Sequence, residues 1–592
     1  MTTVMGGNSI SAEADGFRHP SSEAELIALV RAAAQEGRQL RVRGSAHSPS
    51  YAVYTDPTGD ERNRVEQQTP PASDNINVML DRYRGWSVRD EGRKLVEAQA
   101  GIHLGADPSD PTATATLETS LLHGLFHDKG WTLSSLGGIS HQTVSGFTAM
   151  GSAGGSVIHS INDNLWGFRV IDGAGEVHEF TRDDPDPDVF HAMAPNMGLL
   201  GVVSTITLEC VGTFNIVGQE AITTIEGCAV DLFGSGGGGR PSLEQFLRDT
   251  EYCRVEWWPQ RGVERVLVWQ ATRVAPEPGF TPHPYEEFTN HPELAEVFIS
   301  LLYTIVGNLS DLSHARPQLE LTCARVESLL DLEPWVRKLG RIGEGLARFL
   351  EHAAKFGVEA AIVVLEPFAD LMGRELPTIF PKLLGSFITL DSEKDGSERN
   401  QPQRFQDYGW AGLPMDNGAD DQLVPTEFSE IWVPLGRTQE VMQILTGYFT
   451  EPGDDHEAYR RTGLYAWELY AAKPTSMWMA ASHTDGVDEW RDGALRIDPY
   501  WFAANPGDPA QVFYPAIWTL MRDHQIPFRL HWGKFQPIIE APSREWVDFF
   551  SAHYPRWDEF LTLRAQRDPH DTFLTRYWRD RFGLWDSPAP GA

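Results

Sequence analysis

The hydrophobic and polar positions in the first third of the chain predict alternating helices and strands. The segment Ser22–Gly37 has the pattern of a helix and is followed by a short basic strand. Three short runs rich in apolar and β-branched residues predict further strands, at Asn77–Leu80, Lys94–Ala98 and Val203–Leu208. We therefore expect residues 1 to about 215 to form an α+β unit with glycine-rich turns.

The remainder of the chain mixes the same two patterns. Residues Glu264–Gln270 predict a strand, and Glu333–Phe356 places apolar residues at helical spacing with charged residues between them. Pro334 fits near the start of that helix, where its missing N–H is not needed. The most apolar helix candidate, Leu294–Leu309, is too short to span a bilayer, so no membrane span is expected.

Composition and net charge exclude several classes of protein. A chain of 592 residues is too long for one simple domain, and 41% hydrophobic residues suffice for large cores. The net charge of −34 disfavours binding to nucleic acids and to anionic membranes. We interpret the densest acidic run, Asp183–Asp188, as a solubilising surface segment.

The cysteines and the N-terminus bear on the compartment. Four cysteines are widely spaced and form no Cys-x-x-Cys pair, which argues against a disulfide framework and against a metal site. Residues Met1–Asp15 lack the basic segment and apolar run of a signal peptide. We therefore expect a cytoplasmic protein without a metal.

A turn of small residues around His47 is the first candidate for chemistry. It lies in the string Arg41-Val42-Arg43-Gly44-Ser45-Ala46-His47-Ser48. Small side chains let backbone N–H groups approach an anion closely, and the two arginines strengthen that positive field. A histidine there has room to react with a bound group, whereas a lone histidine beside glycine and serine is more often a hydrogen-bonded loop residue.

The second candidate is a long, almost uncharged segment of small residues, Leu133–Ser156, here called the glycine ribbon. Such a segment can cover a polyanionic ligand with backbone donors, because side chains would keep the ligand away. It contains neither a GxGxxG fingerprint nor a P-loop. A flexible linker is the alternative, and it is disfavoured because four apolar residues punctuate the ribbon, namely Ile139, Val144, Phe147 and Met150.

Three further segments follow these two along the chain. The first combines Asp188–His191 with Gly198–Val203, and the second is the string Arg529-Leu530-His531-Trp532-Gly533-Lys534. The third is the tail, Asp568–Leu574 with Arg581–Gly583. With these motifs the chain resembles the vanillyl-alcohol-oxidase class of PCMH-type FAD-linked oxidases. Within that class it is most similar to the aldonolactone and alditol oxidases, including those of D-arabinono-1,4-lactone and L-gulonolactone. The resemblance extends from about residue 17 to residue 583.

The resemblance implies an α+β fold in two parts. Residues 1–215 would form the PCMH-type FAD-binding domain, and residues 216–540 a substrate or cap domain with an antiparallel sheet and helices. Residues 541–592 would pack back on the FAD domain. Residues 280–400 look like an insertion, which we interpret as an inserted helical layer, with a substrate lid or a partner-docking surface as the alternative.

In this family the histidine at the position of His47 bonds covalently to the 8α-methyl group of FAD. The ribbon contains no cysteine, so a single covalent link is expected. The family's ribbon histidine is replaced by Ala153, which puts one cofactor contact in doubt. The cofactor-binding residues that the resemblance implies are Arg43, Gly44, Ser45, Ala46, His47, Ser48, Gly137, Gly138, Ser140, Thr143, Gly146, Gly151, Ser152, Gly155, Gly201, Val202, Val203 and Lys534.

Gly137 bears on the electron acceptor. In related dehydrogenases a small methyl-bearing residue at this place shields the flavin C4a from oxygen. Glycine leaves space for O2, which favours an oxidase that makes hydrogen peroxide, although tight turns also favour glycine.

The substrate side is predicted from Trp467-Glu468-Leu469-Tyr470 and from Lys534 with His531. Residues i and i+2 of a strand share a face, so Glu468 and Tyr470 would both face the flavin. Glu468 would orient the substrate hydroxyl, and Lys534 would stabilise negative charge on the reduced ring. Relatives carry Glu-x-Arg, and Tyr470 cannot supply a guanidinium's charge. Glu430 is interpreted as structural.

The expected activity is therefore oxidation of an alcohol on a small polar substrate, aldonolactone-like or alditol-like, by FAD and O2. Three alternatives stay open. They are a bulkier tailoring intermediate as substrate, a dehydrogenase with a non-oxygen acceptor, and a flavin-fold binding protein without catalysis.

Overall fold

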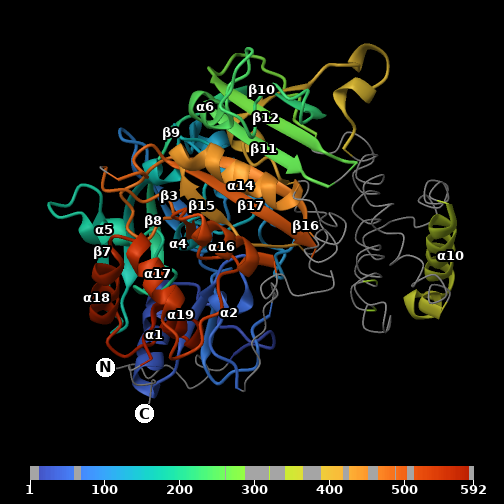
Figure 1. The fold of residues 1–592 in the computed structure, drawn as a ribbon. Coiled ribbons are helices and arrows are strands. Elements are labelled where there is room, and N and C mark those ends of the chain that lie inside the picture. Colours follow the sequence, from blue (N-terminus) through green and yellow to red (C-terminus); the bar gives the residue numbers. More distant parts are fainter. Residues whose placement is uncertain are drawn as a thin grey trace.

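The computed structural model describes residues 12–58, 69–260, 262–286, 316, 319, 340–363, 388–417, 426–450, 464–486, 488–502 and 513–585. Two large sheets form the body of the molecule, and both are antiparallel (Figure 1). The expected α+β class is confirmed. The expected helix Leu294–Leu309 and most of the 280–400 insertion lie outside the described residues.

The smaller sheet belongs to the N-terminal part of the chain and has the strand order β3-β4-β8-β6-β7. Its members are β3 (Trp86–Asp90), β4 (Leu95–Gln99), β8 (Val202–Glu209), β6 (Leu165–Ile171) and β7 (Val177–Thr181). Two short pairs accompany it, parallel β1 (Leu40–Arg43) with β2 (Ile76–Met79) and antiparallel β5 (Trp131–Thr132) with β9 (Val211–Gly212).

The larger sheet has nine strands in the order β13-β10-β12-β11-β16-β17-β15-β18, with β14 also on β17. The strands are β10 (Asn215–Thr224), β11 (Tyr252–Trp258), β12 (Arg265–Val274), β13 (Gln403–Tyr408), β14 (Thr426–Phe428), β15 (Ile431–Pro434), β16 (Leu464–Ala472), β17 (Ala494–Phe502) and β18 (Arg529–Leu530). β11 and β16 are central, and both are largely buried in their described positions. Side chains on these strands are therefore held by packing on both faces of the sheet.

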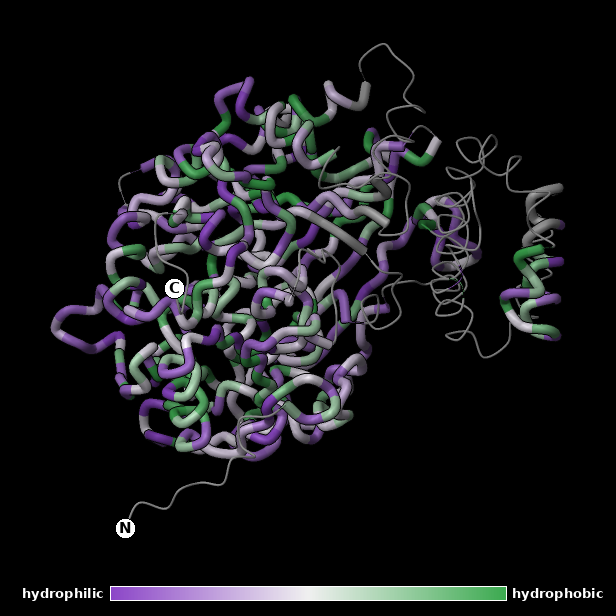
Figure 2. The backbone as a smooth tube through the Cα atoms, turned by 90° about the horizontal axis from the view of Figure 1, so that it is seen from below, coloured by the Kyte–Doolittle hydropathy of each residue, from purple (hydrophilic) through white to green (hydrophobic). Residues whose placement is uncertain are grey.

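The described helices are mostly short. They are α1 (Glu23–Glu36), α2 (Ser50–Val53), α3 (Leu121–Gly124), α4 (Val144–Met150), α5 (Asp188–Ala192), α6 (Leu243–Asp249), α10 (Gly340–Phe356), α12 (Gly409–Gly412), α14 (Thr438–Thr450), α16 (Phe513–Asp523), α17 (Glu545–His553), α18 (Trp557–Arg567) and α19 (Arg576–Phe582). α10 lies to one side of the two sheets in both views (Figures 1 and 2). None of the helices in the described part combines the length and apolar character needed to cross a bilayer.

Helix α1 follows from its sequence. Ser22 caps its first turn by accepting a hydrogen bond from the Glu25 N–H, and Gly37 ends it at φ +62°. Its buried face consists of Leu26, Leu29, Val30 and Ala33, which pack on β1 and β2. The predicted helix Ser22–Gly37 is thus confirmed, and the amphipathic helix predicted at Glu333–Phe356 is found from Gly340 onward.

The acidic run Asp183–Asp188 lies on the loop between β7 and α5. This loop projects from the body as a hydrophilic segment (Figures 1 and 2). Its residues are exposed or half-buried, as a solubilising surface segment requires.

The C-terminal helices return to the N-terminal part of the chain. The backbone N–H of Leu40 donates to the carbonyl of Thr572 at 2.8 Å, and Gly173 N donates to Arg567 O at 2.7 Å. The indole N–H of Trp578 donates to the carbonyl of Ala52 at 3.3 Å. These contacts place α18 and α19 beside β1, β6 and α2, where residues 541–592 were expected. The boundaries of the expected domains stay predictions.

Candidate active site

The turn that carries His47 follows β1 and lies against the glycine ribbon. Ser45 Oγ donates a hydrogen bond to the carbonyl of His141 at 2.8 Å. A Cβ on Gly44 would lie only 2.7 Å from Thr143 Oγ1, so this close approach of the two segments requires glycine. Ala46 adopts φ +62°, a conformation that turns the chain sharply just before His47.

The imidazole of His47 presents a nitrogen without a protein partner. Its Nε2 atom is buried and has no hydrogen bond within the described residues. A buried polar atom left unpaired costs about 1–3 kcal/mol, so such an atom indicates a missing partner. The ring of His141 lies 5.8 Å away, centroid to centroid. A buried His47 Nε2 without a partner among the described residues, next to the small residues of its turn, fits the covalent FAD attachment that the resemblance implies.

The two arginines around this turn are already used by the protein. The buried guanidinium of Arg41 donates to the carbonyls of Ala52 at 2.9 Å and Met197 at 2.8 Å. Arg43 is also buried, with its Cζ 6.0 Å from the centre of the Phe17 ring. The N–H donors of Arg41 therefore hold loops of the N-terminal part of the chain together, and the expectation that its charge strengthens an anion-binding field stays a prediction.

The glycine ribbon passes between the two sheets. A Cβ on Gly138 would lie 2.1 Å from Asp416 Oδ2, and a Cβ on Gly155 would lie 2.1 Å from the carbonyl oxygen of Cys253. The Cys253 N–H also donates to the Gly155 carbonyl at 2.9 Å, which ties the ribbon to β11. Glycine is required at position 155 because the ribbon touches the backbone of β11 directly, whereas Gly138 meets the end of the Asp416 side chain, beyond α12. The ribbon is thus a packed segment, and the alternative of a flexible linker is wrong.

The other predicted cofactor residues are divided between the ribbon and β8. Ser140 N donates to the side chain of Asn417 at 2.9 Å, and Thr143 caps α4 by accepting from Gly146 N at 3.2 Å. Gly151 ends α4 at φ +80° and leads into Ser152. Gly201 adopts φ +130° just before Val202 and Val203, which begin β8 in the smaller sheet.

The C-terminal motif meets the His47 turn. Lys534 Nζ donates to the carbonyl oxygen of His47 at 3.3 Å. A Cβ on Gly533 would lie 2.7 Å from Ser48 Oγ and 3.3 Å from Met150 Cβ. Segments almost 490 residues apart in the sequence are thus in contact, and this contact is the geometry that the motif-based prediction requires.

His531 and Glu430 lie next to Lys534. Burial lowers the pKa of His531 to about 4, so its imidazole is neutral at pH 7. Its Nδ1 accepts a hydrogen bond from Gly533 N at 3.0 Å. Glu430 is buried; Trp432 donates to it at 2.8 Å, and Arg496 Nε lies 3.3 Å away. These contacts fit the structural role expected for Glu430.

Charged side chains form two rows across the centre of the larger sheet. Residues directly opposite each other on neighbouring strands point to the same face. The first row is Arg254, Tyr470 and Arg496 on β11, β16 and β17, and the second is Glu256, Glu468 and Asp498 on the same strands. Glu468 and Tyr470 thus share a face as predicted, and Tyr470 Oη donates to Glu468 Oε2 at 3.0 Å.

The arginine missing from the Glu-x-Arg motif has counterparts on both neighbouring strands. Arg254 is the cross-strand partner of Tyr470 on one side and Arg496 on the other. The Cζ of Arg496 lies 4.3 Å from the centre of the Tyr470 ring, a cation–π contact. The prediction that Tyr470 supplies no positive charge is correct for this residue. The sheet nevertheless has two guanidinium groups beside it.

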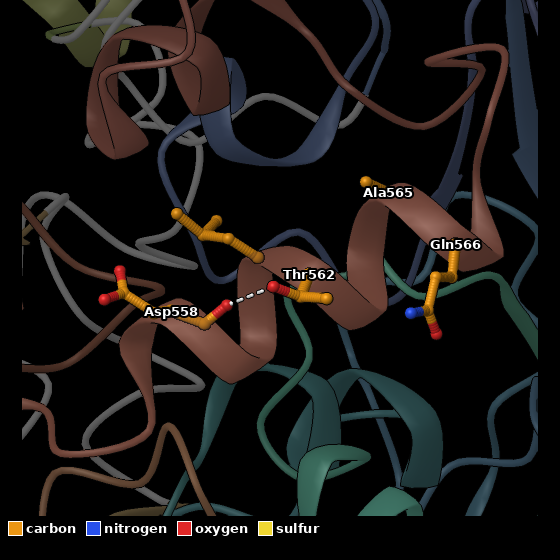
Figure 3. A pocket seen from close by; sticks show the side chains of 5 residues that line it. Asp558, Thr562, Ala565 and Gln566 are labelled. Atoms are coloured by element: carbon orange, nitrogen blue, oxygen red, sulfur yellow. Dashed lines mark hydrogen bonds between the residues drawn. The ribbon is translucent and has the colours of Figure 1, made fainter.

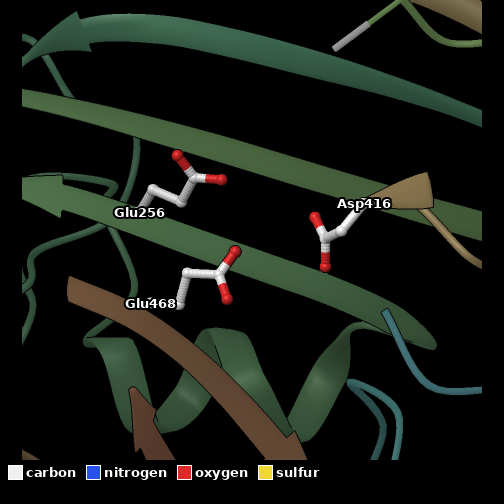
Figure 4. Close-up of side chains that lie close together, drawn as sticks. All are labelled: Glu256, Asp416 and Glu468. Carbon is white, nitrogen blue, oxygen red and sulfur yellow. The ribbon is translucent and has the colours of Figure 1, made fainter. Parts of the chain in front are cut away.

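Arg254 lies within a largely buried group of carboxylates. Figure 4 shows Glu256, Asp416 and Glu468 directed toward a common space, with their nearest oxygens within 4.8 Å of one another. The Arg254 guanidinium contacts all three, Glu256 at 3.3 Å, Glu468 at 3.6 Å and Asp416 at closer range. It also lies 3.8 Å from Glu220. Because the Arg254 guanidinium already contacts all three carboxylates, we assign no metal site to this group.

Burial dominates the electrostatics of this group. It raises the pKa of Glu220 to about 8 and that of Glu256 to about 7, although Arg254 lowers both. It also raises the pKa of Asp498 above its ordinary value, against the effect of Arg496. In Glu430 the same burial is outweighed by Arg496 and by its other cationic neighbours, so its pKa is lowered. On this sheet face, burial and the arginine charges therefore act on the carboxyl pKa values in opposite directions.

Ala153, which replaces the ribbon histidine of relatives, packs on a small apolar cluster that includes Trp432, Ala472 and Ala481. A cavity of about 20 Å³ remains between the ribbon and these residues, enough for one water molecule. The carbonyl of Ala153 accepts a hydrogen bond from Arg496 at 2.7 Å. The ribbon is therefore still anchored to the larger sheet at Ala153, although the imidazole is absent.

A second hollow lies far from this chemistry, on the outer face of α18. It is open to solvent and lined by Asp558, Leu561, Thr562, Ala565 and Gln566 (Figure 3). Its one dashed contact is the helical hydrogen bond from Thr562 Oγ1 to the Asp558 carbonyl, at 2.8 Å. We assign it no function.

Several residues of the charged group were not selected from the sequence, namely Arg254, Glu256, Asp416 and Arg496. One signal was present for the first two. They stand at i and i+2 in Tyr252–Trp258, where the remaining residues are apolar or aromatic. Two charges on one face of an otherwise apolar strand indicate a buried polar site or a solvated face. The register that decides between them was not readable from the sequence.

No family model matches the chain. Curated relatives include the D-arabinono-1,4-lactone oxidase of Eremothecium gossypii, 27% identical over 260 residues, which are 44% of this chain and 41% of that protein. The Saccharomyces cerevisiae enzyme of the same name is 26% identical over 264 residues, or 44% and 42%. The L-gulonolactone oxidase of Mus musculus is 26% identical over 244 residues, or 41% and 45%. The match thus spans less than half the length of these relatives.

Solved structures match over almost the whole chain. A cholesterol oxidase from Brevibacterium sterolicum has a TM-score of 0.59 at 13% identity and covers 95% of this chain and 93% of its own. A solvent-stable cholesterol oxidase has a TM-score of 0.57 at 14% identity, covering 96% and 94%. Identity this low shows the fold alone. The chain is therefore similar over part of its length to D-arabinono-1,4-lactone and L-gulonolactone oxidases, and it shares the PCMH-type fold of cholesterol oxidase.

Proposed function

We propose that this protein is an FAD-dependent oxidase that oxidises an alcohol carbon of a small polar substrate, with O2 as the final acceptor and hydrogen peroxide as product. The observation that carries the proposal is the contact between Lys534 and the His47 turn, at 3.3 Å. It brings the expected attachment point and the expected charge-stabilising lysine into one site. The names of the curated relatives support the substrate class.

The residues of the chain have separable roles in this proposal. Bound FAD supplies the acceptor for a hydride. Glu468 orients the substrate hydroxyl and receives its proton, Lys534 places a positive charge next to the His47 turn, and neutral His531 acts only through hydrogen bonds. Tyr470 orients Glu468 through their hydrogen bond at 3.0 Å.

Replacing His47 by alanine is expected to abolish the covalent attachment of FAD. After acid precipitation the wild-type pellet should be yellow, because the Nε2 atom bonds to the cofactor, whereas the His47→Ala supernatant should contain the released colour. His141→Ala tests the neighbouring ring, and His178→Ala, on β7, is the surface control; both should give yellow pellets. A yellow pellet from His47→Ala would refute the attachment site.

Replacing Gly137 by alanine is expected to slow reoxidation of the reduced enzyme by O2 by about tenfold or more, equivalent to about 1.4 kcal/mol. The added Cβ would lie 3.1 Å from Phe147 Cε2 and 3.3 Å from the Ile139 carbonyl, so it fits only with a small displacement. Stopped-flow absorbance measures the rate. Gly212→Ala, where the Cβ meets nothing within 4 Å, is the control. An unchanged rate, with dye reduction faster than peroxide formation, would favour a dehydrogenase.

The second candidate is an oxidase of a bulkier alcohol. Tyr470 stands in the place of the relatives' arginine and favours this candidate. A phenol lacks the positive charge and the paired N–H donors with which a guanidinium binds the oxygens of a lactone or polyol. Turnover of D-arabinono-1,4-lactone, L-gulonolactone and sorbitol, compared with a panel of hydrophobic alcohols including cholesterol, decides between the two.

A further inference from the structure

Glu256 and Glu468 are direct cross-strand partners on β11 and β16. Their side chains are 16% and 5% exposed, and the nearest carboxylate oxygens of the two residues lie within 4.8 Å. The side chains of Glu256 and Glu468 both point into the common space drawn in Figure 4. Two carboxylates this close in a buried site cannot both ionise without a large cost, so such a pair tends to hold one proton.

The contacts of the pair indicate which residue is ionised. Glu468 Oε2 accepts a hydrogen bond from Tyr470 Oη at 3.0 Å and a second, shorter one from Tyr500 Oη. Hydroxyl donors stabilise a carboxylate. Glu256 has no hydroxyl donor among the described residues, and its cationic contact is Arg254 Nε at 3.3 Å. Burial, together with the hydrogen bond to Glu468, raises the pKa of Glu256 to about 7 although Arg254 lowers it.

The surrounding charges come from every strand packed against the pair. On the β10 side, Glu220 lies 3.8 Å from Arg254 and accepts from Tyr285 Oη at 2.6 Å. On the ribbon side, Asp416 pairs with Arg254, and its Oδ2 lies 3.1 Å from Tyr470 Oη. On β17, Asp498 is paired with Arg496 at 2.6 Å. Arg254 is thus shared among four carboxylates and cannot by itself keep both members of the pair ionised.

We propose that Glu256 is a positioning residue for the proposed alcohol oxidation, because it shares a proton with Glu468 and thereby fixes and tunes that carboxylate as the proton acceptor. The inference rests on the proposed function. In the step it serves, the substrate O–H bond breaks and its proton passes to Glu468. The C–H bond of the carbon that bears this hydroxyl also breaks, and its hydrogen leaves as a hydride, which carries two electrons to the flavin. The alcohol thereby becomes a carbonyl.

The proton on Glu256 occupies its partner. When Glu256 is protonated, it donates a hydrogen bond to Glu468 and takes up an acceptor position of that carboxylate. When Glu256 ionises as pH rises through about 7, this donor is lost, and Glu468 can accept the proton of the substrate hydroxyl instead. The rate constant for flavin reduction is therefore expected to rise with pH through a limb centred near pH 7. This pH dependence arises from the ionisation of Glu256, which affects the reaction through Glu468.

The kinetic test uses Glu256→Gln in the holoenzyme. Glutamine keeps a hydrogen-bond donor toward Glu468 but does not titrate, so the limb near pH 7 should disappear from anaerobic flavin reduction by D-arabinono-1,4-lactone or by whichever panel alcohol reduces the flavin. Glu220→Gln, which removes a carboxyl on the other side of Arg254, should retain the limb. A limb that persists in Glu256→Gln, or is lost in Glu220→Gln, overturns the proposal.

A second measurement needs no turnover. Infrared difference spectra of the holoenzyme, recorded between about pH 6 and pH 8, should show the loss of a protonated carboxyl band, and subtracting the Glu256→Gln spectra should isolate it. The absence of that band overturns the shared proton even if the enzyme oxidises alcohols. If the band is present but no alcohol reduces the flavin, the pair exists, the proposed function fails, and the assignment of Glu256 to that reaction fails with it.

Discussion

Replacing Glu468 by glutamine is expected to lower the rate constant for flavin reduction by about 10²–10⁴-fold at neutral pH, the usual contribution of a positioned general base. The amide can still accept hydrogen bonds from Tyr470 and Tyr500, so the sheet should retain its packing. It cannot accept the substrate proton. Anaerobic stopped-flow absorbance of the flavin measures the effect directly and separates it from reoxidation by O2.

The effect of Glu468→Gln should appear in kcat as well as in kcat/KM, because the lost interaction is made with the departing proton in the transition state. Glu97→Gln, on β4 of the other sheet and 40% exposed, is the matched control and should retain the wild-type rate. A decrease of less than about tenfold for Glu468→Gln would mean that another group receives the proton, since a general base contributes more than this. Asp416, next to Gly138, would then be the first candidate to test.

The sequence predicted the type and approximate position of the local elements, and the differences at their ends have local causes. The strand expected at Lys94–Ala98 begins at Leu95 because Lys94 adopts φ +56°. The strand expected at Glu264–Gln270 begins at Arg265 for the same reason, since Glu264 adopts φ +45°. Left-handed residues interrupt a strand, and the hydrophobic pattern does not reveal them.

The end of that second strand was missed for a different reason. β12 continues to Val274 because it pairs along its whole length with β10. Of its last five residues, Gln270 to Val274, three are polar and only Ala271 is buried, so the apolar run that marked the strand had already ended. Tertiary pairing therefore extended the strand beyond its local signal.

The candidate site was predictable where motifs are local and unpredictable where it depends on register. His47, the ribbon and Lys534 were found from short strings, and they are in contact. The Arg254–Glu468 contact depends on β11 pairing with β16, more than 200 residues later in the chain, at one particular register. A shift of one residue between the two strands would place these side chains on opposite faces of the sheet, and the sequence does not specify that register.

The same dependence explains the interpretation of Tyr470. From the sequence alone, tyrosine in place of arginine is a lost charge. In the sheet it is a phenol between two guanidinium groups, with its hydroxyl on Glu468. An arginine at this position would place three cations side by side, so tyrosine is the residue that this arrangement of strands accommodates.

Replacing Arg254 by methionine is expected to lower the free energy of unfolding by about 3–5 kcal/mol at pH 8, the usual cost of removing one partner from a buried ion pair. Methionine keeps much of the aliphatic volume but leaves Glu220, Glu256, Glu468 and Asp416 without their shared cation. Denaturation in urea, followed by tryptophan fluorescence at several pH values, measures the loss. Arg82→Met, which breaks an exposed ion pair with Glu13, should cost less than about 1 kcal/mol.

The pH dependence of this loss identifies its cause. In the folded protein the pKa values of Glu220 and Glu256 are raised, to about 8 and about 7, from an ordinary value of 4.5. Carboxyls with a raised pKa favour folding fully below about pH 4.5, and that contribution is lost as pH rises through 7 and 8. Without Arg254 their pKa values rise further, so the difference between Arg254→Met and wild type should be smallest near pH 4.5 and widen toward pH 8. An equal loss at both pH values would assign the effect to packing instead of charge.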